Sequence, residues 1–249
     1  MHKTIKTVAI IPAAGIGRRM GGVKKQFLEI DGTPVITETL TKFELSGNID
    51  TVIPVIRGED LTHFKTAILG ANSFSKIHEV VVGGEERQVS VSNALERAGG
   101  YDIILVHDGV RPFVTVDMIN NAVDQAKIHG AVVTAIPLKD TIKEVSCSGQ
   151  VVKTLDREAL FRIQTPQAFK RELLMSAFTE AKKKGITGTD ESSLLEVLGF
   201  PIKVIPGAEF NLKITTQDDL WFCKQKGETQ PGKLKKTETV PRSLKKSEA

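Results

Sequence analysis

The feature that most constrains this fold is a regular alternation of two hydrophobic patterns along the chain. Short runs rich in β-branched residues predict strands at Thr7–Pro12, Thr51–Ile56, Ile77–Val82, Ile103–His107 and Ala131–Ile136. Apolar residues at three- and four-residue spacing predict helices at Ile36–Ser46, Leu61–Leu69, Gln88–Ala98, Val116–His129 and Arg171–Lys184. Apolar strands separated by helices indicate an α/β fold, with a mostly parallel twisted sheet and helices on both faces. Such sheets bind ligands beyond the carboxyl ends of their strands.

One segment, Leu138–Leu160, breaks this alternation. It reads LKDTIKEVSCSGQVVKTLDREAL, in which two short β-type runs flank a turn at Cys147–Gly149. This pattern predicts a β-hairpin. Because the hairpin stands where another helix is expected, we expect it to project from the sheet as an arm. An arm of this kind suits either a contact with a second subunit or a simple surface hairpin.

The net charge of +4 at pH 7 is confined to the C-terminal segment. Residues 225–249 hold seven of the 34 Lys and Arg residues and three of the 30 Asp and Glu residues, which leaves 27 of each in residues 1–224. A formally neutral body offers no general basic face, so we expect no nucleic-acid partner. Residues 225–249 are also poor in apolar side chains, which predicts a disordered basic tail after one domain of residues 1–224. A contact between this tail and an anionic partner is the alternative.

The apolar segments and the cysteines bear on cellular location. No apolar run approaches the ~20 residues that span a bilayer, so we expect no membrane association. The short apolar run after the basic N-terminus continues directly into a charged loop, which indicates a buried strand and not a signal peptide. Cys147 and Cys223 are the only cysteines and form no disulfide framework or metal motif. These features predict a cytoplasmic protein.

Glycines and cations crowd the loop that follows the first predicted strand, which reads PAAGIGRRMGGVKKQF from Pro12 to Phe27. Its start resembles a dinucleotide fingerprint, but Met20 occupies the third glycine position and no acid ends the second strand. The P-loop pattern also fails, because no Gly-Lys-Ser/Thr follows. A glycine turn with exposed N–H groups and several cations suits a polyphosphate whose charge rises during reaction, as in nucleotidyl transfer.

Six motifs occur in order between Pro12 and Thr215: PAAGIGRRM…KKQF, GGEERQVSV, VHDGVRPF, LDREALFRIQTPQAF, GTDESSLLE and NLKIT. Together they resemble the bacterial 2-C-methyl-D-erythritol 4-phosphate cytidylyltransferases of the non-mevalonate isoprenoid pathway. The resemblance implies a Rossmann-like nucleotidyltransferase fold, a homodimer joined by the hairpin arm, and a divalent cation, usually Mg²⁺. The implied reaction joins CTP to methylerythritol phosphate and releases pyrophosphate. We expect the nucleotide phosphates to hold the Mg²⁺, and we assign no protein ligands to it.

The resemblance also assigns candidate residues to the nucleotide. Backbone of the first loop and of the loop after the third strand is expected to contact CTP, with an acid after the fourth strand: Ala13, Ala14, Gly15, Gly17, Gly83, Gly84, Ser90 and Asp108. Arg19 and Lys25 are expected to flank the α-phosphate as catalytic residues. Arg18 and Lys24 are the neighbouring alternatives, because Lys24 replaces a common proline in a loop one residue shorter than is usual.

The second substrate has a different set of candidates. Its phosphate is itself the nucleophile, so cations that hold it are required and a strong general base is not. Arg157 and Lys213 match the positioning residues of the family, and the polar residues expected around them are Asp108, Arg111, Thr141 and Thr189. Arg157 and Thr141 lie on the arm, so a second subunit would supply them.

Three further polar residues near these motifs are interpreted as structural. We expect His107 to be a hydrogen-bonded residue at a strand end, and Asp190 and Glu191 to start a helix. Two other functions stay open at this point. One is a ribitol 5-phosphate cytidylyltransferase, whose motifs overlap heavily with these. The other is a catalytically silent nucleotide-binding regulatory protein.

Overall fold

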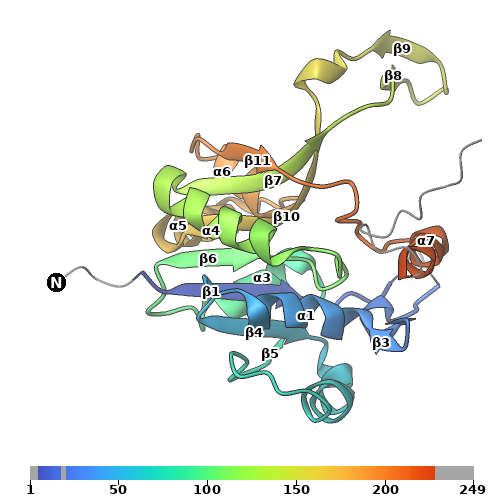
Figure 1. The fold of residues 1–249 in the computed structure, drawn as a ribbon. Coiled ribbons are helices and arrows are strands. Elements are labelled where there is room, and N and C mark those ends of the chain that lie inside the picture. The colour runs from blue at the N-terminus through green and yellow to red at the C-terminus, as the bar shows by residue number, and fades with distance from the viewer. Residues whose placement is uncertain (1–4, 18–20, 228–249) are drawn as a thin grey trace, which may run out of the picture.

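The computed structural model describes residues 5–17 and 21–227, and residues 1–4, 18–20 and 228–249 lie outside the described parts. Seven strands form one sheet in the order β11-β7-β10-β6-β1-β4-β5 (Figure 1). Their bounds are β1 Thr7–Pro12, β4 Thr51–Ile56, β5 Val81–Val82, β6 Ile103–Val106, β7 Ala131–Pro137, β10 Phe161–Lys170 and β11 Lys203–Pro206. Neighbouring strands are parallel except for β10, which runs antiparallel to both β6 and β7. The predicted mostly parallel α/β sheet is confirmed.

Helices cover both faces of this sheet. The helices are α1 Val35–Leu45, α2 Leu61–His63 continued by the π-helical η4 Phe64–Leu69, α3 Arg87–Leu95, α4 Val116–His129, α5 Arg171–Lys184, α6 Glu191–Glu196 and α7 Gln217–Gly227. One core joins α1, η4 and α4 to the side chains of Ala9 and Ile11 on β1. The opposite core joins α3, α5 and α6 to Val8 and Ile10 of the same strand. Alternate residues of β1 therefore enter two separate cores, because successive strand side chains point to opposite faces.

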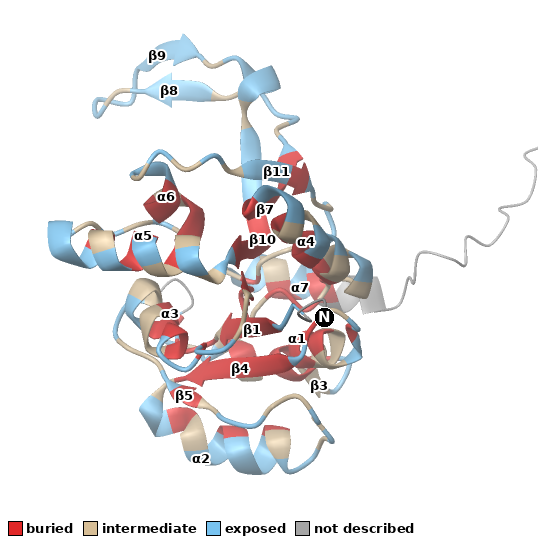
Figure 2. Cartoon of the chain, turned by 90° about the vertical axis from the view of Figure 1, so that its left-hand side faces the viewer, coloured by how far each residue is buried: buried red, intermediate tan, exposed pale blue. Residues whose placement is uncertain are grey.

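The arm forms where the sequence predicts it. Its strands β8 Lys143–Val145 and β9 Val151–Thr154 pair as an antiparallel hairpin that extends away from the sheet (Figure 1). The base closes through a 3.1 Å hydrogen bond from the Leu138 N–H to the Leu160 carbonyl. Every residue of β8 and β9 is exposed (Figure 2), so the packing of this chain on itself does not explain the arm.

One predicted strand is shorter than expected, and four strands of the structure are not predicted from the sequence. The run Ile77–Val82 forms a strand only at Val81–Val82, because residues 77–80 make no ladder with β4. Strands β10 and β11 are not among the predicted strands, and the apolar pattern of β10 is interrupted by Gln164, Thr165 and Gln167. A small hairpin of β2 Glu29–Ile30 and β3 Thr33–Pro34 is not among them either. The expected boundary between residues 224 and 225 falls inside α7, and most of the expected tail lies outside the described residues.

Within the described parts of the chain, we find no helix with the length and apolar character needed to cross a membrane.

Candidate active site

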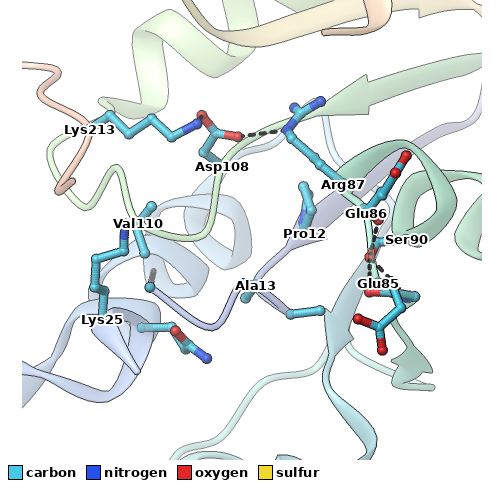
Figure 3. Close-up of a pocket in the computed structure, with 15 residues that line it drawn as sticks. Pro12, Ala13, Lys25, Glu85, Glu86, Arg87, Ser90, Asp108, Val110 and Lys213 are labelled. Carbon is cyan, nitrogen blue, oxygen red and sulfur yellow. Dashed lines mark hydrogen bonds and ion pairs between the residues drawn. The ribbon is translucent and has the colours of Figure 1, made fainter. Parts of the chain in front are cut away.

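A pocket with a cavity volume of about 160 Å³, open to solvent, lies at the carboxyl edge of the sheet. It forms where the loops after β1, β5 and β6 meet the segment before α7 (Figure 3). The sequence-predicted residues that line it are Ala13, Ala14, Gly15, Gly17, Lys25, Gly84, Ser90, Asp108 and Lys213. The fold therefore brings most of the expected nucleotide residues to one place. Arg19 and its alternative Arg18 lie outside the described residues.

The glycine-rich loop is fixed at its start and needs glycine at its first bend. The Ala13 N–H donates a 2.8 Å hydrogen bond to the Val55 carbonyl, which ties the loop to the end of β4. Gly17 has a φ of +63°, and a Cβ added there would lie 2.1 Å from the Val23 carbonyl oxygen. The bend at Gly17 thus excludes a side chain on both conformational and steric grounds.

The two adjacent lysines of this loop have different surroundings. Lys24 forms ion pairs with the buried carboxylate of Asp60 and, at 3.2 Å, with Glu59. Both acids belong to η3 (Gly58–Asp60), outside the lining of the pocket. Lys25 begins the short helix η2 (Lys25–Phe27) and lines the pocket, as does the buried Gln26 beside it (Figure 3). The geometry therefore separates a lysine that anchors the loop from one that faces the ligand space.

The loop after β5 lies against the glycine-rich loop. A Cβ on Gly83 would lie 2.4 Å from the Cβ of Ala14 and 2.9 Å from the Ser90 Oγ, so glycine allows this contact. The Gly84 N–H donates to the Ser90 Oγ at 3.1 Å, and that hydroxyl donates to the Glu86 carbonyl at 3.0 Å. Ser90 lies inside the first turn of α3 and shapes the loop as well as lining the pocket.

Asp108 is the centre of a charged cluster. Its carboxylate is 7% exposed and pairs with Lys213 Nζ at 2.9 Å, Arg87 Nε at 3.2 Å and Arg111 Nε at 3.4 Å. Its backbone N–H donates to the Thr165 Oγ1 at 3.0 Å, which fixes the residue on the loop after β6. Burial by itself raises the pKa of Asp108, but these three cations outweigh burial and hold the pKa well below its usual range. Asp108 is therefore an anion at any physiological pH.

Arg87 and Glu191 complete this cluster, and sequence reasoning gave neither of them a functional role. The Arg87 guanidinium holds Glu191 through two hydrogen bonds of 2.6 and 2.9 Å while its Nε contacts Asp108. Burial raises the pKa of Glu191, and Arg87 opposes that rise. Burial also lowers the pKa of Arg87, but the two carboxylates more than reverse this effect. Arg87 stands within the quoted GGEERQVSV motif, which is the signal that could have identified it.

Backbone contacts around residue 211 place Lys213 and Arg111 beside Asp108. The Arg111 guanidinium is buried and donates to the Asn211 carbonyl at 2.7 Å. The Asn211 amide in turn donates to the Thr165 carbonyl at 2.8 Å, and the Ile214 N–H donates to the Val110 carbonyl at 3.0 Å. The segment that carries Lys213 is thereby joined to the loop that carries Asp108. Arg111 contacts Asp108 but does not itself line the pocket.

His107 is a structural residue, as predicted. Its ring is fully buried, with Nε2 3.2 Å from the Arg111 carbonyl and Nδ1 3.1 Å from the Thr165 Oγ1. Burial lowers the pKa of His107 to about 3, so the ring is neutral. Asp190 starts α6 as expected, because its carboxylate accepts the Ser193 N–H at 2.9 Å in a capping box. Glu191 lies at the start of α6, as predicted. The sequence suggested only a favourable interaction with the helix dipole, whereas the structure pairs Glu191 with Arg87.

Besides Arg111, three other predicted acceptor residues do not line this pocket. Thr141 and Arg157 lie on the exposed arm, where the Arg157 guanidinium donates to the Lys139 carbonyl at 2.7 Å. Thr189 is exposed just before the start of α6. Within one subunit, the described residues therefore bring together the nucleotide candidates with Lys213, but not the full acceptor set.

Comparisons with known proteins agree with this geometry. Residues 7–225 match the model of the 2-C-methyl-D-erythritol 4-phosphate cytidylyltransferase family. A protein of that name from Syntrophus aciditrophicus (strain SB) is 40% identical over 231 residues, which cover 92% of this chain and 99% of the relative. One from Bacillus licheniformis is 44% identical over 212 residues, covering 85% and 91%.

A solved structure extends the likeness to the fold. The crystal structure of 4-diphosphocytidyl-2C-methyl-D-erythritol synthase from Anaerococcus prevotii DSM 20548 matches with a TM-score of 0.81 and 31% identity. The match covers 90% of this chain and 96% of that one. The sheet topology, the glycine-rich loop and the cations at the carboxyl edge thus define a nucleotidyltransferase of Rossmann-like fold. More particularly, the chain belongs to the 2-C-methyl-D-erythritol 4-phosphate cytidylyltransferase family.

Proposed function

We propose that this enzyme condenses CTP with 2-C-methyl-D-erythritol 4-phosphate, giving 4-diphosphocytidyl-2-C-methyl-D-erythritol and pyrophosphate for isoprenoid precursor synthesis. The family match over residues 7–225 names this reaction. The structural observation that supports this reaction is that Lys25, Asp108 and Lys213 line one pocket. We place the reaction in the cytoplasm, a proposal supported by the scarcity of cysteine.

The chemical step is an in-line displacement. An oxygen of the acceptor phosphate attacks the α-phosphorus of CTP, a new P–O bond forms, and the bond to the β-phosphate breaks to release pyrophosphate. Negative charge grows on the oxygens around the α-phosphorus, so cations fixed in advance stabilise the transition state. We assign this role to Lys25, which lines the pocket, together with Arg19 of the same loop. The acceptor phosphate is already ionised, so the step needs no general base.

Backbone groups would hold the nucleotide. Ala14, Gly15 and Gly17 of the glycine-rich loop line the pocket, where their backbone would contact the triphosphate. Gly84 and Ser90 also line the pocket, and we assign them, with Gly83 of the same loop, to the cytosine base. Asp108 lines the pocket as well and suits the ribose hydroxyls or the acceptor hydroxyls as a hydrogen-bond acceptor.

The acceptor half of the site is proposed to form between two subunits. Lys213 would hold the acceptor phosphate, with Arg111, Thr189 and Asp108 as polar support. Arg157 and Thr141 lie on an arm that extends from the sheet and is exposed along both of its strands, which suits insertion against a second copy of the chain (Figure 2). A homodimer joined by the arms would bring these two residues to the partner's pocket.

The groups around the pocket suit a magnesium ion that enters together with the nucleotide. Mg²⁺ usually takes one or two carboxylates together with substrate phosphates. The described residues contain no cluster of three or more His, Cys, Asp or Glu that could bind the ion without a substrate. Both oxygens of Asp108 are already paired with cations of the protein, so we assign the ion to the nucleotide phosphates. The bound ion would supply electrostatic screening of the triphosphate charge.

A pyrophosphate-release assay tests this function. The purified protein is mixed with CTP, Mg²⁺ and either 2-C-methyl-D-erythritol 4-phosphate or ribitol 5-phosphate. We expect release with the first acceptor, at a kcat/KM clearly above that with the second. Preference for ribitol 5-phosphate would show that it is the acceptor substrate instead, and no release with either acceptor would contradict the proposed activity. Repeating the assay with EDTA and then with added Mg²⁺ tests the cation.

A further inference from the structure

Glu191 is a buried ionisable residue that the proposed reaction does not use. Its side chain is 1% exposed, and it stands at the first position of α6, two residues after Thr189. A carboxylate is costly to bury unless a partner offsets the lost hydration. Its partner is the Arg87 guanidinium, which reaches it from α3 across 104 residues of sequence. Helix α6 therefore carries a buried charge that is paired with Arg87, a residue that lines the pocket.

Arg87 is shared between two carboxylates in a fixed arrangement. Both terminal nitrogens of its guanidinium hold Glu191, and Nε alone contacts the Oδ1 of Asp108. The other oxygen of Asp108, Oδ2, accepts from Lys213 at 2.9 Å and lies 3.4 Å from Arg111. The two oxygens of Asp108 thus face different cations, and the forked contact with Glu191 maintains this division.

The same end of α3 also holds the segment before α6. The Gln88 amide donates to the Ile186 carbonyl at 3.1 Å and accepts the Gly188 N–H at 2.9 Å. Arg87 and Gln88 directly follow the loop that we assign to the cytosine base. The start of α3 therefore contacts both halves of the site, the nucleotide loop and the segment that contains Thr189.

We propose that Glu191 is a positioning residue: by holding the Arg87 guanidinium, it leaves Asp108 Oδ2 to Lys213 and so sets the acceptor half of the site. This inference rests on the proposed function, because it assigns the acceptor phosphate to Lys213. A guanidinium prefers two parallel hydrogen bonds to one carboxylate. Without Glu191, Arg87 can turn its fork onto both oxygens of Asp108 and compete with Lys213. The hydrogen bonds that shape the loop after β5, from the Gly84 N–H to the Ser90 Oγ and from the Ser90 hydroxyl to the Glu86 carbonyl, do not involve Glu191.

The test compares two variants of α6. Glu191→Gln removes the charge with little change in size. Ser193→Ala is the matched control, because it weakens the capping box of the same helix without touching Arg87. For Glu191→Gln we expect the KM for methylerythritol phosphate to rise by at least ~10-fold while the KM for CTP stays within about 2-fold, the pattern of a selectively lost substrate contact. Ser193→Ala should lower the Tm and leave both KM values within about 2-fold.

The possible outcomes distinguish a failure of the Glu191 proposal from a failure of the proposed function. Wild-type protein that releases no pyrophosphate contradicts the proposed function. Active wild-type protein with equal effects on both substrates in Glu191→Gln, or with the same kinetic pattern in Ser193→Ala, shows that Glu191 only stabilises the fold. Should Glu191→Gln fail to fold, Glu191→Asp keeps the charge but shortens its reach, and the same selective rise in KM for the acceptor is expected. Equal changes for both substrates would again overturn the proposal.

Discussion

Lys24 and Lys25 are adjacent in the chain, but their side chains serve different parts of the structure. Lys24 pairs with Glu59 and Asp60 beside the end of β4, and Lys25 lines the pocket. The pair with Asp60 involves a carboxylate that is only 6% exposed, which makes it an anchor for the loop. The family pattern favours Lys25 and keeps Lys24 as an alternative, and their tertiary partners distinguish the two lysines.

This difference predicts opposite kinetic results for the two lysines. Lys25→Ala is expected to lower kcat by at least ~100-fold, the scale of losing one transition-state donor. Lys24→Ala should keep kcat within about 3-fold, because the change removes an anchor of the loop and no contact with the reacting atoms. Pyrophosphate release at saturating substrates measures both. A larger loss of kcat in Lys24→Ala than in Lys25→Ala would reverse the assignment.

Gly83 is predicted to be intolerant of even a methyl group. A Cβ there would lie 2.4 Å from the Ala14 Cβ, so Gly83→Ala must push the nucleotide loops apart. We expect the KM for CTP to rise by about 10-fold or more, since misplacing positioning groups by a fraction of an ångström is costly. Gly47→Ala is the control, because a Cβ at Gly47 meets no atom within 4 Å and the residue lies outside the pocket lining. An unchanged KM in Gly83→Ala would contradict the close contact of the two loops.

Sharing of the arm predicts complementation between inactive subunits. Lys25→Ala removes a group from the pocket, and Arg157→Ala removes one from the arm. In a mixed dimer, one of the two composite sites would have both residues intact, so each mixed dimer should have about half of the wild-type activity. Random exchange of equal amounts of the two inactive variants should therefore restore about a quarter of the wild-type activity to the whole mixture. Native mass spectrometry establishes whether subunits exchange. Exchange without any return of activity would show that Arg157 acts within its own subunit.

The buried neutral ring of His107 predicts a loss of stability in mild acid. The folded pKa of about 3 lies below the ordinary value of 6.5, so only the unfolded chain takes up the proton between these values. Stability from this residue is therefore complete above pH 6.5 and falls as the pH decreases toward 3. From pH 7 to pH 5 the free energy of unfolding should drop by about 2 kcal/mol more in wild type than in His107→Gln. Urea unfolding at the two pH values measures this difference, and equal drops would show that His107 titrates normally.

Several elements were predictable because local pattern is sufficient for them. Strands β1, β4, β6 and β7 are continuous apolar runs, and the amphipathic helices that cover them repeat at helical spacing. Parallel strands place their carboxyl ends at one edge, so the loops that follow them had to meet there. Much of the pocket follows from this rule together with the quoted motifs.

Strand β10 shows why the remaining part could not be predicted. It lies in the middle of the sheet, yet Gln164, Thr165 and Gln167 are buried within it. Each is stabilised by a partner far away in sequence: the Ala208 carbonyl, the His107 ring and the Asp190 carboxylate, respectively. A polar run buried by distant hydrogen bonds has no apolar period, so it carries no local strand signal.

The alternating strands and helices, the projecting arm and the family motifs can be read from the chain alone, because each depends on residues close together in the sequence. Folding was needed to show that Lys25, and not Lys24, lines the pocket, and that Arg87 joins Asp108 to Glu191. These outcomes depend on which charges meet after folding. The energy of a charge depends on its burial and on partners that the chain brings together from distant positions, and no local pattern encodes that.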